Sequence, residues 1–164
     1  MHIRTTTRAD GELLARLISA SNRDVAIRFR LDAESCPKHP SFCTAAWVAA
    51  DIQRGARYFI IERDGEAVGC VAYEDGGEGT AYLNRLSVLP AWRRRGTGEL
   101  LVRHVIELAR SSGIGTVSIG IIAAHAELKN WYLGMGFTEG ETKTFPHLPF
   151  AVSYLTYAVH DLRR

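Results

Sequence analysis

A basic turn with two glycines organises this sequence, and it reads Arg93-Arg94-Arg95-Gly96-Thr97-Gly98. The apolar residues 81–89 before it are typical of a strand, and the amphipathic residues 97–111 after it are typical of a helix. The first N–H groups of a helix lack intrahelical partners and carry about half a positive charge from the helix dipole. Glycine lets a ligand approach the backbone, and arginine donors suit phosphate oxygens. We therefore expect the turn to bind a pyrophosphate.

Two common phosphate-binding motifs do not describe this turn. A P-loop requires G-x-x-x-x-G-K-[ST], which occurs nowhere in the chain. A dinucleotide-binding fingerprint requires a third glycine at position 101, where the sequence has Leu101. The remaining pattern is R-x-x-G-x-G, directly after a strand that ends in Val88-Leu89-Pro90.

A second motif follows later in the chain, Tyr132-Leu133-Gly134-Met135-Gly136-Phe137. With this motif, the sequence resembles the GNAT superfamily of acetyl-CoA-dependent N-acetyltransferases. That family has a strand of the type L-x-V-x-P, here residues 86–90, then Q/R-x-x-G-x-G/A, and then Y-x-x-x-G-F. Taken singly, a solvated basic turn and an ordinary helix end are the alternatives. Both motifs in this order, with a helix and a strand between them, favour the family.

Length and composition restrict the class of protein. A chain of 164 residues with 46% apolar residues predicts a single domain, residues 1–164, with a sizeable core. The net charge of +2 gives no general case for nucleic acid or a membrane surface. No apolar run approaches the ~20 residues of a membrane span. The first residues lack the apolar region of a signal peptide, so we expect a cytoplasmic protein with reduced cysteines.

The cysteine spacing raises the question of a metal site. Cys36, His39 and Cys43 read C-x2-H-x3-C, a spacing found in zinc sites. The sequence offers no second ligand pair, two prolines interrupt the stretch, and Cys70 lies in an apolar strand pattern. We expect no metal.

The periodicity predicts an α/β (α+β) fold, with a mixed sheet and helices on both faces, and the resemblance implies that the sheet is mostly antiparallel. The expected strands are residues 2–5, 57–63, 66–74, 80–89, 114–123, 137–143 and 152–160. Helices are expected from residue 8 onward and over residues 42–54, 97–111 and 124–134. Residues 21–41 are expected to be irregular. The resemblance implies that the sheet splays between the strands ending near Leu89 and Ala123.

The resemblance assigns the turn to acetyl-CoA, the co-substrate. It implies that the pyrophosphate binds the backbone N–H groups of Arg95, Gly96, Thr97 and Gly98. The side chain of Arg93 occupies the Q/R position of the family. The side chains of Arg94 and Arg95 either reach the adenosine phosphates or face solvent.

The strand before the turn is assigned to the pantetheine arm. In the family, this arm pairs with the open edge of the strand, here Leu86, Ser87 and Val88. The N–H of Val88 would also face the thioester carbonyl, where one such donor contributes ~3 kcal/mol in an acyl transfer. Tyr132 is the candidate general acid, because a phenol of pKa near 10 can protonate a thiolate. A core tyrosine is the alternative.

The acceptor amine must lose a proton before it can attack, so the reaction requires a proton acceptor. Strand alternation predicts that Tyr82, Asn84, Leu86 and Val88 share one face, and none of them is a carboxylate. This favours a water relay held by Asn84 and Tyr82, although both residues could also be structural.

Two positions near the second motif concern the cofactor. The family often has Asn seven residues before the tyrosine, where this chain has His125. His125 either replaces the Asn contact, serves in a proton relay near neutral pH, or is a surface residue at a helix start. Asn130 is a candidate contact to the far end of the cofactor.

The implied function is transfer of acetyl from acetyl-CoA to a primary amine of a small molecule. Residues 21–41 and the Phe145–Phe150 loop are expected to line the acceptor pocket. Two alternatives are a toxin that acetylates aminoacyl-tRNA, which would need a broad basic face, and a non-catalytic acetyl-CoA sensor. The oligomeric state is left open, with a homodimer included.

Overall fold

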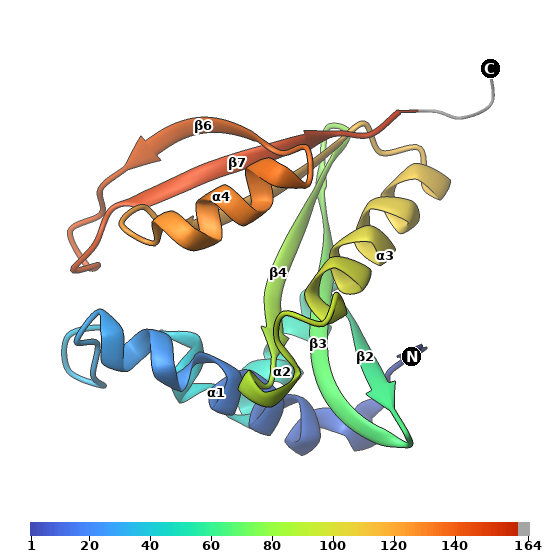
Figure 1. Ribbon diagram of the computed structural model, residues 1–164, viewed down its shortest axis with the longest axis horizontal. Coiled ribbons are helices and arrows are strands. Elements are labelled where there is room, and N and C mark those ends of the chain that lie inside the picture. Colours follow the sequence, from blue (N-terminus) through green and yellow to red (C-terminus); the bar gives the residue numbers. More distant parts are fainter. Residues whose placement is uncertain (161–164) are drawn as a thin grey trace.

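The computed structural model describes residues 1–160, so residues 161–164 of the expected domain lie outside the described residues. The helices are α1 (Gly11–Arg28), α2 (Ala45–Gln53), α3 (Thr97–Ser111) and α4 (Ala126–Gly134). The strands are β1 (His2–Thr5), β2 (Arg57–Arg63), β3 (Glu66–Gly77), β4 (Thr80–Val88), β5 (Thr116–Ile122), β6 (Thr138–Lys143) and β7 (Val152–Ala158). Short 3-10 turns occur at Arg8–Asp10, Pro40–Phe42 and Pro90–Trp92. The expected element order is confirmed (Figure 1).

The strands form one sheet in the order β1-β2-β3-β4-β5-β7-β6, with a parallel pair only at β4 and β5. These two strands pair only at their beginnings, where Thr80, Ala81 and Tyr82 face Thr116, Val117 and Ser118. Beyond Tyr82 they diverge (Figure 1), so the edge of β4 from residue 83 to 88 has no partner strand on that side within residues 1–160. The expected splay is confirmed.

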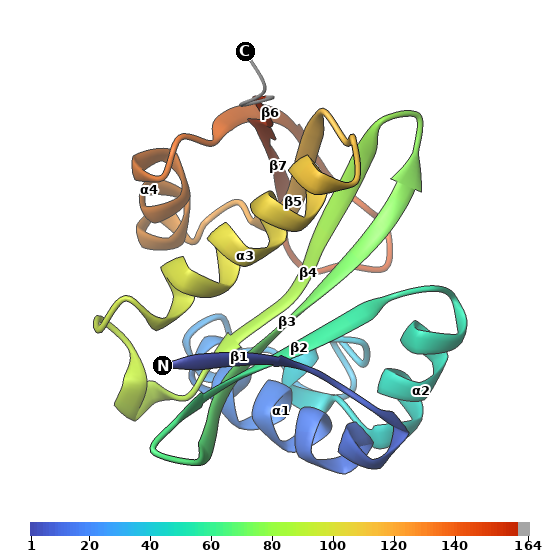
Figure 2. The ribbon, with the colours of Figure 1, turned by 90° about the vertical axis from the view of Figure 1, so that its right-hand side faces the viewer.

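Helices cover both faces of the sheet (Figure 2). In β2, Phe59 and Ile61 point into the core beneath α3, whereas Tyr58 and Ile60 point into the core beneath α1 and α2. A strand covered on both faces needs apolar residues at consecutive positions, which explains the uninterrupted apolar run in β2.

Helix α3 has the bounds that its periodicity predicts. Its buried apolar residues recur every three or four positions, at Leu101, Val102, Val105, Ile106 and Ala109. The helix starts after Gly96, whose φ of +79° places it in the left-handed region that glycine adopts at low cost.

The expectation of an irregular segment over residues 21–41 is wrong for its first third. Helix α1 continues to Arg28, because the helical spacing of buried residues extends from Leu14 and Ile18 through Ser21. After the helix, Phe29 packs in a small cluster with Leu148 and Phe150 from the loop between β6 and β7. The two segments expected to line an acceptor pocket therefore contact each other.

The expectation that Tyr82, Asn84, Leu86 and Val88 share a face is also wrong. Asn84 pairs with Ala72 and Ser87 with Cys70, so the two residues between them on β4 oppose one residue on β3. This β-bulge is centred on Arg85, whose φ is +56°. A one-residue shift reverses the faces of all residues that follow. Leu86 and Val88 therefore lie on the α3 side, and Asn84 and Arg85 both lie on the α1 and α2 side.

Two further observations concern membranes and metals. Every helix within residues 1–160 falls short of the length and apolarity that crossing a bilayer requires. In the same residues, no group of three or more His, Cys, Asp and Glu side chains is arranged to hold a metal ion. His39 instead hydrogen-bonds Ser41 through Nδ1 at 2.8 Å.

Candidate active site

A cavity of about 570 Å³ lies where the sheet splays, between α1, β4, α3 and α4. It brings together the edge of β4, the basic turn and the start of α4. The predicted residues that line it are Leu86, Ser87, Val88, Arg93, Arg94, Gly96, Gly98 and His125. The open β4 edge and the N-terminus of α3 thus face the same space.

The N-terminus of α3 has the properties of an anion site. No side chain caps the helix, and the first backbone bond into it runs from the Leu100 N–H to the Gly96 carbonyl. The N–H groups of the first turn therefore point toward the cavity without an intrahelical partner. A Cβ on Gly98 would lie 3.3 Å from the Trp131 ring, so a side chain here would press on the cavity wall. The buried Thr97 holds the turn, since its hydroxyl donates to the Trp92 carbonyl at 3.1 Å.

Arg93 is engaged by the protein itself. Its guanidinium pairs with Asp24 on α1, donates to the Ser21 carbonyl, and donates from Nε to the Val88 carbonyl at 3.2 Å. The hydrogen bond from Arg93 lowers the pKa of Asp24. A direct phosphate contact by Arg93 stays a prediction, and it would require the Asp24 pair to open.

The other two arginines of the turn differ from each other. Arg94, with φ +61°, lines the cavity. The guanidinium carbon of Arg95 lies 5.1 Å from the centre of the Trp92 ring, and Arg95 is not part of the cavity wall. Of these two side chains, Arg94 is the one placed to reach a phosphate.

Two residues of the β4 edge have distinct surroundings. The Ser87 side chain is buried and accepts a hydrogen bond from Asn22 on α1 at 3.2 Å. The carbonyl of Val88 already accepts from Arg93, so the oxyanion role predicted for this residue concerns its N–H.

His125 caps α4 and faces the cavity. Its Nδ1 accepts the Leu128 N–H at 3.3 Å, and its ring centre lies 5.6 Å from that of Phe29. Burial, and next the charge of Arg28, lower the pKa of His125, so the ring is neutral near pH 7. With Nδ1 as acceptor, the proton resides on Nε2. This favours a fixed Nε2 donor over a relay that exchanges protons.

Tyr132 lies in an aromatic cluster. It is 3% exposed, its ring packs against Trp131 and Phe137, and it is not among the residues that line the cavity. Burial raises the pKa of its phenol. Its role as general acid stays a prediction.

Besides Arg95, Thr97 and Tyr132, three more predicted residues are not among those that line this cavity. Tyr82 is 42% exposed and packs over Gly76, and Asn130 is exposed at the surface of α4. Asn84 lines a second cavity of about 310 Å³ and donates to Glu74 of β3 at 3.2 Å. Glu74 is a carboxylate next to Asn84, and it forms an ion pair with Arg54, with Nε 2.7 Å from Oε1. Sequence reasoning missed it, because it depends on the register between the two strands.

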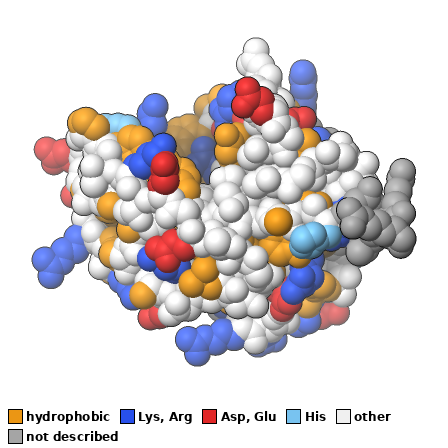
Figure 3. All heavy atoms as spheres, turned by 90° about the horizontal axis from the view of Figure 1, so that it is seen from above, with side chains coloured by type: hydrophobic (Ala, Val, Ile, Leu, Met, Phe, Trp, Pro, Cys, Tyr) orange, Lys and Arg blue, Asp and Glu red, His pale blue; other side chains and the backbone are white. Residues whose placement is uncertain are grey.

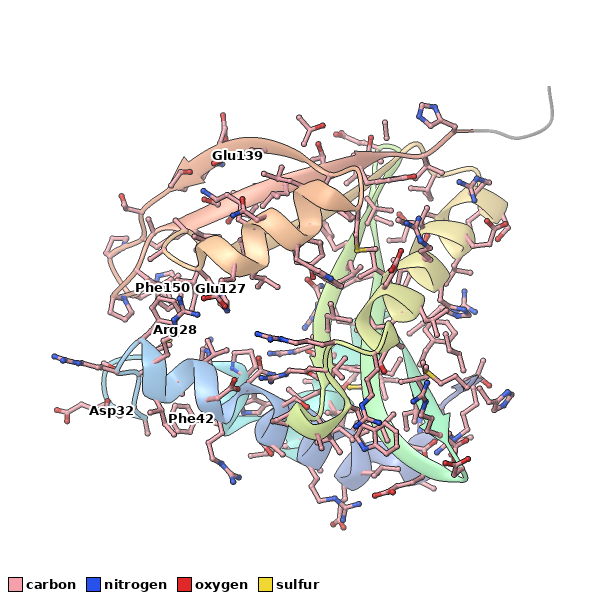
Figure 4. The ribbon with its side chains drawn as sticks, viewed as in Figure 1. Arg28, Asp32, Phe42, Glu127, Glu139 and Phe150 are labelled. Atoms are coloured by element: carbon pink, nitrogen blue, oxygen red, sulfur yellow. The ribbon has the colours of Figure 1, made fainter. Side chains whose placement is uncertain are left out.

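Residues of α1 also line the cavity, and they belong to the segment 21–41 that was expected to line the acceptor pocket, although none of them was named as a site residue. Ser21, Asn22, Asp24, Val25 and Arg28 line the cavity, and continued helical spacing beyond Ile18 could have revealed them. Among the described residues, the Ser21 hydroxyl is the buried side-chain polar atom without a hydrogen-bond partner. At the mouth, Arg28 of α1 faces Glu127 of α4 (Figure 4), with Nη2 3.5 Å from Oε1.

The splayed sheet and this site are of the GNAT type. Residues 23–137 match the model of the Acetyltransferase (GNAT) family, and the chain belongs to that family. The resemblance carried by the two motifs is thereby confirmed.

Particular relatives support the assignment. The chain is 32% identical over 92 residues to an amino-acid acetyltransferase of Ralstonia nicotianae, covering 56% of this chain and 20% of that protein. It is 26% identical over 115 residues to the probable N-acetyltransferase camello of Xenopus tropicalis, covering 66% of this chain and 52% of that protein. The chain thus spans a fifth and about half of the length of these relatives. The paia N-acetyltransferase of Thermoplasma acidophilum, solved in complex with coenzyme A, shares the fold with a TM-score of 0.79 at 15% identity. The match covers 96% of this chain and 98% of that chain.

Proposed function

We propose that this protein transfers acetyl from acetyl-CoA to a primary amine of a small molecule. The observation that carries the proposal is the single cavity that joins an open β4 edge to the uncapped N-terminus of α3. An acyl-pantetheine arm requires backbone partners along its length, and its pyrophosphate requires a helix N-terminus or basic groups. The complex of the Thermoplasma relative with coenzyme A supports this choice of ligand.

The reaction proceeds by direct transfer. The neutral amine attacks the thioester carbonyl, a C–N bond forms, the C–S bond breaks, and the sulfur leaves as coenzyme A thiolate. Starting from an ammonium, the amine loses one proton before attack and one afterwards. One of these two protons is released, and the thiolate gains one, so acetyl-CoA and an ammonium yield an amide, free coenzyme A and one proton.

Protein groups are assigned to these steps as follows. The N–H of Val88 stabilises the developing oxyanion, and Nε2 of His125 donates to a carbonyl of the pantetheine arm. Tyr132 protonates the thiolate after a local adjustment that exposes its hydroxyl. Glu74 and Asn84 hold the water that removes the amine proton. Of these donors, the Val88 N–H is preorganised and acts without reorganisation cost during the reaction.

Calorimetric titration with acetyl-CoA, coenzyme A and NADH tests the site. We expect selective binding of the two coenzyme A species. Gly98→Trp should abolish it, because even a Cβ at this position contacts the Trp131 ring. Gly11→Trp is the matched control, since the space around a Cβ at Gly11 is open. Binding of coenzyme A by Gly98→Trp with wild-type affinity would refute the proposed pyrophosphate site at the N-terminus of α3.

Activity is tested by a screen of amines with detection of the released thiol. We expect turnover of small primary amines. A macromolecular acceptor such as aminoacyl-tRNA would be favoured by a broad basic face. Among the described residues on the face shown in Figure 3, basic and acidic side chains are interspersed. Turnover of aminoacyl-tRNA alone would contradict the proposal, and tight acetyl-CoA binding without any turnover would favour a sensor.

A further inference from the structure

The second cavity is lined by residues of β4 that directly precede those lining the first cavity, and it lies on the α1 and α2 side of the strand. Its wall contains Asn84 and Arg85 at the bulge, Glu74 from β3, and Asp51 and Arg54 from α2 and its end. Leu86, the residue after Arg85, lines the first cavity. A molecule in the second cavity would therefore lie next to the strand segment where the thioester is expected.

A buried carboxylate fixes the position of Arg85. Asp51 is 5% exposed and accepts from Tyr58 Oη at 2.5 Å, from Arg54 Nη2 at 3.1 Å and from Arg85 Nε at 3.3 Å. Burial opposes ionisation of Asp51, but the Tyr58 hydrogen bond and the Arg85 charge outweigh it, and the pKa of Asp51 lies below its usual value. The Trp47 ring also lies against the Arg85 guanidinium, with 5.7 Å between the ring centre and the guanidinium carbon.

The far end of Arg85 has unused donors. Within residues 1–160, the hydrogen bonds of its side chain involve Nε alone, so Nη1 and Nη2 have no protein acceptor. These two groups form the planar fork that matches a carboxylate. The side chain is 22% exposed, and Arg85 forms part of the cavity wall.

The charges around the cavity are balanced, and the four groups form one ion-pair network. Asp51 and Glu74 offset Arg54 and Arg85, so a ligand with a net charge gains little. The free donors belong to Arg85, whereas Glu74 accepts from Asn84 at 3.2 Å and forms an ion pair with Arg54, with Nε 2.7 Å from Oε1. A ligand with no net charge that places a carboxylate toward Arg85 matches this arrangement.

We propose that the second cavity binds the acceptor, and that the acceptor is a small amino acid whose carboxylate is held by Arg85. This inference rests on the proposed acetyl transfer and names its substrate class. The carboxylate of the acceptor pairs with Nη1 and Nη2 of Arg85, and its amine lies toward the thioester. Asp51 is a positioning residue that orients the arginine.

The test compares each free α-amino acid with its own amide, which has the same side chain and amine but no carboxylate. Initial rates are measured by thiol release and expressed per concentration of neutral amine, because loss of the carboxylate lowers the amine pKa. We expect at least one amino acid to exceed its amide by about 10- to 100-fold in kcat/KM, as for a hydrogen-bonded charged group. This comparison in the wild-type protein needs no variant.

Variants of Arg85 test whether this residue causes the preference for the free amino acid. Arg85→Gln should lower kcat/KM for the amino acid by about 10- to 100-fold and leave the rate with the amide within threefold. Arg85→Lys should restore part of the preference, since it keeps the charge without the fork. Arg103→Gln is the control, because Arg103 pairs with Glu99 on the exposed side of α3. Affinity for acetyl-CoA should stay unchanged in all three.

The outcomes separate this inference from the proposed function. Equal rates with acid and amide, or equal losses for both in Arg85→Gln, would overturn the assignment of Arg85. Turnover of other amines with no amino acid accepted would overturn the substrate class and leave acetyl transfer intact. No binding of acetyl-CoA would overturn the proposed function itself, and this inference with it.

Discussion

Arg93, in the turn before α3, forms an ion pair with Asp24 of α1, with Nη1 2.5 Å from Oδ2. The pair joins two elements that lie 69 residues apart in the chain, and both residues line the large cavity. A carboxylate is thus held next to the turn that is proposed to bind a pyrophosphate.

Asp24→Asn should strengthen the binding of coenzyme A. Removing the carboxylate eliminates its repulsion toward phosphate and frees part of the Arg93 guanidinium, which favours binding by roughly 3- to 10-fold at low salt. Calorimetry with coenzyme A measures this, and pantetheine, which lacks phosphates, is the control ligand. Equal weakening of both ligands would mean that the pair has only a structural role.

Ser21→Ala should have opposite effects on stability and binding. The hydroxyl of Ser21 is buried without a partner, so its removal should raise the free energy of unfolding of the ligand-free protein by about 1 kcal/mol. If the ligand supplies the missing partner, the affinity for acetyl-CoA should fall by roughly 2- to 10-fold. Urea denaturation and calorimetry measure the two quantities. Ser19→Ala, on the exposed side of α1, is the control. An unchanged affinity would exclude the ligand contact.

The stability of the protein should depend on pH through His125. Its pKa lies below the ordinary 6.5 in the folded state, so between the two values the unfolded chain binds more protons. The contribution of His125 to the free energy of unfolding is therefore fully present above about pH 6.5. It is lost as the pH falls through that value toward the folded pKa. Protonation of Nδ1 also removes the acceptor of the Leu128 N–H.

His125→Asn isolates this contribution, because asparagine is a good N-cap that does not titrate here. Urea denaturation at about pH 7.5 and 5.5 should show a smaller loss of stability in the variant than in the wild type. Burial also lowers the pKa values of His39 and His104, but both residues are present in both proteins. Equal losses in the two proteins would contradict the contribution of His125.

Tyr132→Phe should lower turnover by roughly 10- to 1000-fold and leave the affinity for acetyl-CoA unchanged, if the phenol protonates the leaving thiolate. Because burial raises the phenol pKa, this step should not add an inflection to the pH–rate profile below about pH 10. Tyr157→Phe is a matched control, since the Tyr157 ring packs on Phe137 in the same aromatic cluster. Wild-type turnover in Tyr132→Phe would make Tyr132 a core residue and leave the acid unassigned.

Local sequence patterns predicted most of the elements. The buried positions of α3 recur at helical spacing, and the β2–β3 hairpin follows from two apolar runs around Asp64-Gly65. The first motif identified the turn and the strand that line the large cavity. These features depend on neighbours in the chain, so the sequence by itself determined them.

Only the tertiary structure decided which side chains meet. The bulge at Arg85 reverses the faces of Leu86 and Val88. The alternation of side chains along a strand does not predict such a one-residue insertion. The partners of Arg93, and the placement of Glu74 beside Asn84, depend on contacts between distant segments. Local periodicity specifies the spacing of side chains along one element, whereas the register and packing between elements determine which of those side chains form the site.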